Sequence, residues 1–159
     1  MTRFLATTLA AGSLLLAGSA AVAADAHDQA RQIAEKVTAD GAALFDACDA
    51  HAMAATYDEK AVLVVYQRKD GEVGRDVRLG REKIEGFYAD LFKQPETIKS
   101  KNTVDRARLL APDVLTIDGT FDTNTLKSDS IKVPFHQVRQ KKDGEWLVLT
   151  MEISLLSME

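Results

Sequence analysis

The sequence predicts an α+β domain, because helical patterns dominate its first half and strand patterns its second half. Apolar residues recur at three- and four-residue steps between Asp28 and Thr56, which is typical of an amphipathic helix. All three prolines lie beyond residue 94, and two Asp-Gly pairs, at 70–71 and 143–144, mark tight turns between strands. Helices at the front followed by a strand meander favour α+β over alternating α/β architecture.

The individual elements follow from local patterns. The first helical segment, residues 28–56, is rich in alanine and is expected to break at Asp46–Asp49. A second helix over residues 81–93 ends before Pro95, since the residue ahead of a proline avoids helical geometry. Strands are predicted by β-branched runs and by alternating polarity at residues 61–66, 73–79, 97–110, 114–121, 131–140 and 146–156, with a polar loop at 124–130.

Residues 1–23 have the three parts of a cleaved secretory signal peptide. Arg3 supplies the positive charge, Phe4–Ala17 is apolar, and Ala21–Ala23 is a small-x-small cleavage site. Polar and glycine residues dilute the apolar segment below what a membrane span needs. We therefore expect a single domain over residues 24–159, located in the periplasm or secreted, with no membrane attachment after cleavage.

The composition of the mature chain limits the classes of partner that it can bind. Without Arg3 the chain carries 19 basic and 24 acidic side chains, a net charge of −5, which argues against nucleic acid as a partner. The lone cysteine, Cys48, falls on the apolar stripe of the first helical segment, so it is expected to be buried. Three histidines without a close spacing of further ligands predict no metal site.

Four stretches keep the order and spacing of one known fold. They are residues 49–57 leading into 58–62, residues 79–84 followed by Phe87 and Tyr88, residues 138–146, and residues 151–154. With the order of elements, they resemble the NTF2-like superfamily and its SnoaL-like, DUF4440-type branch. The resemblance covers nearly all of residues 24–159 and is specific to a fold, not to an activity.

The resemblance implies a strongly curved antiparallel sheet that folds around the helices like a cone, with a pocket at its open end. Members of the family include isomerases, dehydratases, polyketide cyclases and binding or association domains, so function has to be argued from the pocket. Ketosteroid-isomerase chemistry needs a carboxylate base and a tyrosine. When the chain is aligned on Asp49, the position of the base falls at about Val64–Val65 and that of the tyrosine at about Gly41. Neither position carries the required group.

The last strand raises the question of which face points into the cone. By the period-two rule, Val148, Thr150 and Glu152 share one face. If that face points inwards, apolar neighbours would raise the pKa of Glu152 and suit it to acid–base chemistry. In the alternative, this polar face meets solvent or a partner, and the apolar face from Leu147 to Leu155 forms the core. The candidate catalytic residues are Glu152, His136 and Asp118, and the candidate ligand-binding residues are Tyr57, Tyr66 and Thr150.

Two functions remain open at this stage. One is an exported module that binds a small organic ligand or associates with protein, as a homodimer through its sheet, because an uncovered apolar sheet face has to be buried. The other is a lyase, isomerase or cyclase that acts without a cofactor on a small organic molecule in the cone pocket. The enzyme needs at least two ionisable groups converging in that pocket, so the directions of Glu152 and His136 distinguish the two.

Overall fold

The structure, a computed structural model, describes residues 17–93, 97–125 and 131–156. Residues 1–16, with Arg3 and most of the apolar part of the predicted signal peptide, lie outside the described residues, as does most of the expected polar loop at 124–130. The described elements are α1 (Ala17–Asp46), α2 (Ala50–Ala55), β1 (Tyr57–Lys69), β2 (Glu72–Leu79), α3 (Arg81–Leu91), β3 (Thr97–Ala111), β4 (Val114–Thr125), β5 (Ile131–Lys142) and β6 (Glu145–Ser154). Of these helices, none is long and apolar enough to cross a membrane.

The predicted break in the first helical segment is confirmed. Helix α1 ends at Asp46, and Asp49 caps α2 by accepting a hydrogen bond of 2.8 Å from the backbone N–H of Ala52. The prediction that Cys48 is buried is wrong: the residue lies in the turn between the helices, with φ 53°, and is exposed. Helix α1 also begins earlier than predicted, at Ala17, so it runs across the predicted cleavage site, and cleavage itself stays a prediction.

The six strands form one sheet in the order β2-β1-β6-β5-β4-β3. Both predicted Asp-Gly turns are confirmed, because they join β1 to β2 and β5 to β6. The expectation of a purely antiparallel sheet is wrong for one pair: β1 and β6 run parallel. These two strands lie far apart in the chain and are not joined by a hairpin, so no tight turn imposes an antiparallel direction on them.

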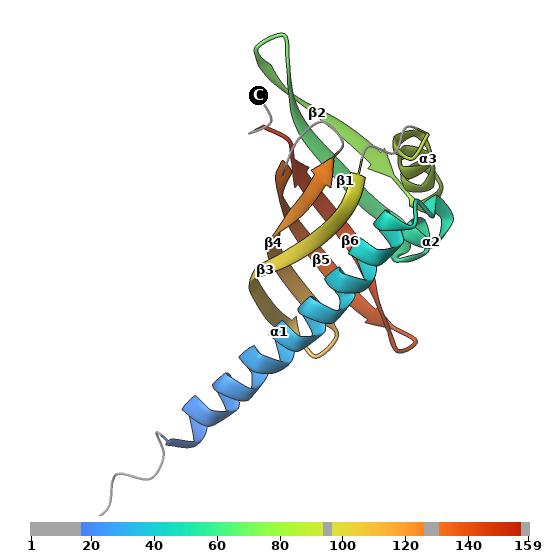
Figure 1. Ribbon diagram of the computed structural model, residues 1–159. Coiled ribbons are helices and arrows are strands. Elements are labelled where there is room, and N and C mark those ends of the chain that lie inside the picture. Colours follow the sequence, from blue (N-terminus) through green and yellow to red (C-terminus); the bar gives the residue numbers. More distant parts are fainter. Residues whose placement is uncertain (1–16, 94–96, 126–130, 157–159) are drawn as a thin grey trace, which may run out of the picture.

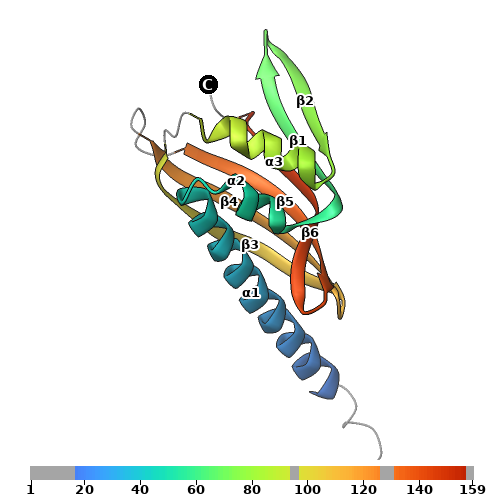
Figure 2. The same cartoon turned by 90° about the vertical axis from the view of Figure 1, so that its right-hand side faces the viewer.

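The sheet curves around α1, as the views in Figures 1 and 2 show. Small side chains on α1, at Ala30, Ala34 and Ala42, are buried and allow the helix to lie close to the sheet. At the end of α1, Asp46 accepts hydrogen bonds from both the hydroxyl (2.6 Å) and the backbone N–H (2.9 Å) of Ser100 on β3. These contacts hold one wall of the cone, while the β1–β2 hairpin projects beyond the rest of the sheet (Figures 1 and 2).

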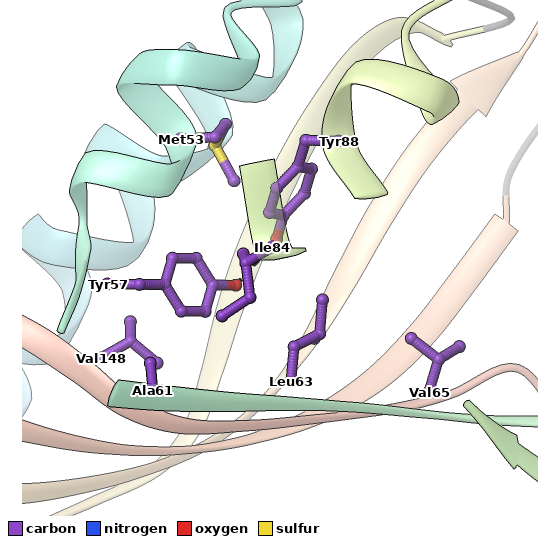
Figure 3. Packing of buried hydrophobic residues seen from close by; sticks show 8 residues of the cluster. All are labelled: Met53, Tyr57, Ala61, Leu63, Val65, Ile84, Tyr88 and Val148. Carbon is purple, nitrogen blue, oxygen red and sulfur yellow. Dashed lines mark hydrogen bonds between the residues drawn. The ribbon is translucent and has the colours of Figure 1, made fainter. Parts of the chain in front are cut away.

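A second cluster of buried side chains fixes α2 and α3 against β1 and β6. Figure 3 shows it, with Met53 from α2 and Tyr88 and Ile84 from α3 above Leu63 of β1 and Val148 of β6. Helix α3 can start where it does because Gly80 adopts φ 82° and donates its N–H to the carbonyl of Ala61 (2.8 Å). A side chain at position 80 would be strained in that conformation.

One extra residue in β6 decides which of its side chains face the cone. The pairing of β5 with β6 steps from Val138–Thr150 to Arg139–Val148, so Leu149 forms a β-bulge. Because of this bulge, Val148 and Met151 both face inwards, although they are three residues apart. The prediction that Val148 shares a face with Thr150 and Glu152 is therefore wrong. The alternative, in which the later apolar residues of β6 join the core, is confirmed for Met151, Ile153 and Leu155.

Candidate functional site

The cone encloses a pocket of about 650 Å³ between the helices and the inner face of the sheet. Its walls come from α1, α2, α3 and strands β1, β3, β4, β5 and β6, and most of the lining is aliphatic or aromatic. The apolar lining includes Val37, Phe45, Met53, Val65, Phe87, Phe92, Phe121, Val133, Phe135, Val148, Met151 and Ile153. A pocket of this size and character is typical of sites for small organic molecules.

Three phenylalanines from different elements hold one side of the pocket together. The rings of Phe45 and Phe121 lie edge to face with centroids 4.9 Å apart, and those of Phe45 and Phe92 lie 5.2 Å apart. Arrangements of this geometry are favourable beyond the area that they bury. They join the end of α1 to β4 and to the end of α3, so one wall of the pocket is built from three elements in mutual contact.

Two tyrosines supply polar groups inside the pocket. The hydroxyl of Tyr57 on β1 lies 2.8 Å from the hydroxyl of Tyr88 on α3, and both side chains are buried (Figure 3). Burial raises the pKa of both phenols, so both are neutral near pH 7. The guanidinium of Arg81 donates two hydrogen bonds, of 2.9 and 2.7 Å, to the carbonyl of Tyr57, which fixes the backbone that carries this ring.

A buried cation lies on the same lining. Arg139 of β5 is 5 % exposed, and its Nε donates to Gln137 Oε1 (2.8 Å) while Nη1 donates to the carbonyl of Trp146 (2.9 Å). Burial lowers the pKa of Arg139 to about 10, against the opposing effect of Tyr57 and Tyr88, and that value still leaves the side chain charged at neutral pH. The pocket therefore combines apolar walls with a small group of polar side chains, and one of these, Arg139, is a buried positive charge.

Of the six candidate site residues, the structure places Tyr57 alone in the pocket lining. Tyr66, His136 and Glu152 line a separate hollow of about 340 Å³ on the outer face of the sheet, together with Pro134 and Ser154. Asp118 and Thr150 also lie on this outer face, because they pair directly with His136 and Val138. The hypothesis that Glu152, His136 and Asp118 act inside the cone pocket is therefore wrong in its location.

The structure does bring the three candidate catalytic residues together on the outer face. His136 Nδ1 lies 2.7 Å from Asp118 Oδ1, and Glu152 is the cross-strand neighbour of His136 on β6. Arg106 on β3 approaches the same aspartate, with Nε 3.9 Å from Oδ2. All four groups are at least partly open to solvent, so the row is a set of surface charges with mutual pairing, not an enclosed site.

The residues that sequence reasoning missed are Tyr88, Gln137 and Arg139. A signal for the last two was present, because Val133, Phe135, Gln137 and Arg139 alternate along β5, and a charged residue on an otherwise apolar strand face is informative. Val65 and Gly41, at or beside the positions where ketosteroid-isomerase chemistry needs a carboxylate and a tyrosine, do line the pocket and carry neither group.

Comparison with known proteins identifies a fold. No protein-family model and no curated protein sequence matches the chain. Among solved structures, a protein from Xanthomonas campestris named for a calcium/calmodulin-dependent protein kinase II association domain is 21 % identical, with a TM-score of 0.55 over 76 % of this chain and 83 % of that chain. A ketosteroid isomerase-like protein from Erwinia carotovora is 15 % identical, with a TM-score of 0.53 over 82 % and 93 %.

A third solved structure covers still more of the chain. It is an NTF2-like protein with a cystatin-like fold from Novosphingobium aromaticivorans, 16 % identical, with a TM-score of 0.56 over 93 % of this chain and 94 % of that chain. The names of these neighbours suggest different functions, so their similarity to this chain shows its architecture and not an activity. In its helices, its curved sheet and its likeness to these structures, the chain has the NTF2-like fold.

Proposed function

We propose that this protein binds a small, largely apolar organic molecule in the cone pocket. The observation that carries the proposal is the pocket itself: about 650 Å³, walled by aliphatic and aromatic side chains, with a few polar groups on one side. A folded domain ordinarily fills its interior to the density of an organic crystal. A pocket of this size inside the cone is therefore best explained by an occupant.

Binding is favoured over catalysis by the ionisable groups present. Among the described lining residues there is no histidine and no glutamate, and the one carboxylate, Asp90, pairs with Lys93 at 2.6 Å. The two tyrosines converge inside the pocket, but burial raises the pKa of both phenols away from neutrality, so neither is suited to act as an acid or base near pH 7. The lyase, isomerase or cyclase alternative thus lacks a buried carboxylate or histidine, among the described lining residues, that could act as its base near pH 7.

The test uses a pocket-filling variant with a matched control. Gly41 lines the pocket, and a Cβ added there meets nothing within 4 Å, so Gly41→Leu places a side chain in the pocket without a clash at its base. Gly86 on α3 has the same freedom but is not among the lining residues, which makes Gly86→Leu the control. The neutral fluorophore N-phenyl-1-naphthylamine is expected to bind the wild type and Gly86→Leu equally, and Gly41→Leu roughly tenfold or more weakly.

Two results would contradict this proposal. The first is the absence of fluorophore binding to the wild type together with no co-purified molecule in native mass spectrometry. The second is fluorophore binding that Gly41→Leu leaves unchanged while circular dichroism shows the same fold as the wild type. Either result would mean that the pocket is not a binding site.

We also propose that the protein works outside the cytoplasm. The support is the predicted signal peptide, with Arg3, the apolar segment and the Ala21–Ala23 site in the expected order. Expression of the full chain in a bacterial host, followed by fractionation and intact-mass measurement, should recover a periplasmic or secreted form that lacks residues 1–23. Recovery of the uncleaved chain from the cytoplasm would contradict export.

A homodimer through the sheet is the third part of the proposal. The helices lie against the inner face of the sheet (Figure 2). The outer face carries half-buried Val62, Tyr66 and Val138 beside the Asp118–His136 pair. A second copy would cover these apolar groups, and Val138→Glu should yield a monomer with an unchanged circular dichroism spectrum. Native mass spectrometry measures the outcome, and a wild-type monomer at micromolar concentration would refute the dimer.

A further inference from the structure

We infer that the occupant of the cone pocket is an organic acid whose carboxylate is bound by Arg139. This inference rests on the proposed binding function and specifies the chemistry of the ligand. It starts from the guanidinium, which carries a full charge, is 5 % exposed and lies on the pocket lining. A buried charge is costly unless an opposite charge compensates it.

The structure does not supply that opposite charge from the chain itself. Both acceptors of Arg139, Gln137 Oε1 and the Trp146 carbonyl, are neutral, and among the described residues no carboxylate lies within 4.0 Å of the guanidinium. The negative charge of Asp40 raises the pKa of Arg139, but Asp40 forms its own ion pair with Lys36 at 2.7 Å. Within the described chain, Nη2 donates no hydrogen bond, so one edge of the guanidinium keeps a free donor.

A purely structural role explains only part of this arrangement. The bond from Nη1 to Trp146 fastens β5 to the start of β6, and the bond from Nε to Gln137 orders the neighbouring side chain. A neutral side chain of similar length with N–H donors would make two hydrogen bonds of this kind without burying a charge. The structural role does not explain the charge of Arg139 or its remaining donor. Both suit a carboxylate, because a guanidinium group can bind a carboxylate through two parallel hydrogen bonds.

The tyrosine pair adds a donor of the same kind. The single hydrogen bond between Tyr57 and Tyr88 uses one hydroxyl hydrogen, and the other has no acceptor among the described residues. The Arg139 charge lowers the pKa of both phenols, though less than burial raises it, which places the guanidinium and the tyrosines in one electrostatic environment. The polar side of the pocket therefore offers spare donors and a positive charge, and the apolar walls suit the rest of an organic acid.

The experiment compares an acid with its neutral amide. Competition of 4-phenylbutyrate and 4-phenylbutanamide against N-phenyl-1-naphthylamine measures their relative affinity at pH 7. The acid is expected to bind the wild type roughly 10- to 100-fold more tightly than the amide, as for hydrogen bonds to charged groups. Arg139→Gln should abolish that preference while retaining fluorophore binding, Arg139→Lys should restore part of it, and the outer-face variant Arg106→Gln should change nothing.

The outcomes separate this inference from the function on which it rests. Fluorophore binding with equal affinity for acid and amide overturns the organic acid and leaves the binding function intact. An acid preference that persists in folded Arg139→Gln also overturns it. If Arg139→Gln does not fold, the wild type decides alone: lowering the pH below the pKa of 4-phenylbutyrate should remove the preference, and a preference that survives protonation refutes a carboxylate contact. Failure of every probe to bind the wild type refutes the binding function itself.

Discussion

Gly119 lies in the middle of β4, where the structure leaves no room for a side chain. A Cβ added there would lie 2.5 Å from the carbonyl oxygen of Thr103 on β3 and 2.6 Å from Cζ of Phe135 on β5. Ordinary contacts begin at about 3.4 Å, so Gly119→Ala requires two neighbours on different strands to move, each by roughly 0.8–0.9 Å. The Thr103 oxygen belongs to the backbone, so it can move only with its strand.

The expected cost follows from this geometry. Over-packing of a well-packed interior lowers the free energy of unfolding by roughly 1–3 kcal/mol, and a clash with backbone belongs to the upper part of that range. A strand glycine at the surface provides the matched control: at Gly74 on β2 a Cβ would meet its nearest atom at 3.9 Å. Replacing either glycine by alanine restricts the unfolded chain similarly, so the difference between the two variants isolates the clash.

Urea unfolding followed by the fluorescence of Trp146 measures both variants on the chain 24–159. We expect Gly119→Ala to unfold with a free energy roughly 1–3 kcal/mol below that of Gly74→Ala, and fluorophore binding to weaken because the displaced Phe135 ring lines the pocket. Equal stability of the two variants would refute the reasoning, since it would show that β3, β4 and β5 yield freely at this position.

Three further predictions concern other contacts of the fold. Tyr57→Phe should lower the free energy of unfolding by about 1–2 kcal/mol, since it leaves the Tyr88 hydroxyl unpaired in an apolar pocket. In urea unfolding, the double variant Tyr57→Phe/Tyr88→Phe should lose less stability than the sum of the two single variants. The Lys142 ammonium lowers the pKa of Asp58, so their pairing stabilises the fold above about pH 4 and is lost on acidification. The free energy of unfolding of the wild type should therefore fall between pH 5 and pH 3, in part because this pair is lost. In Lys142→Met the fall measured by urea unfolding should be smaller by up to about 1 kcal/mol. Native Cys48 should react with Ellman's reagent without unfolding, and bound N-phenyl-1-naphthylamine should slow the reaction, because the thiol is exposed at the pocket lining; equal rates with and without the fluorophore would contradict this.

The sequence predicted the elements because most of their limits are marked by local chemistry. Asp-Gly turns, Gly80 before a helix and Pro95 after it act through the backbone angles of one or two residues, and the structure places element ends close to all of them. The direction of β1 relative to β6 could not be predicted in this way. It depends on how residues some ninety positions apart meet in the sheet, and no local pattern encodes that.

The candidate site was predicted less well than the fold, and for a definite reason. Assignment of the faces of β6 relied on unbroken alternation, and a single bulge at Leu149 broke that alternation, so Val148 lies on the opposite face from Thr150 and Glu152. Glu152 stands out in the sequence as a possible acid or base, whereas a cation on an apolar strand face such as Arg139 is a less obvious signal. Arg139 was visible as an exception to the alternation of β5, but its burial and its free donor emerge only when all the pocket walls are in place.

The bulge in β6 also determines how the strand tolerates shortening. Deletion of Leu149 would leave Val148 and Met151 separated by one residue, as a regular strand requires, so every later side chain would keep its face. Deletion of Glu152, which is exposed and at first sight expendable, would turn Ile153 and Leu155 out of the pocket. In β6, therefore, a residue's exposure indicates how readily it can be replaced, but not whether it can be removed.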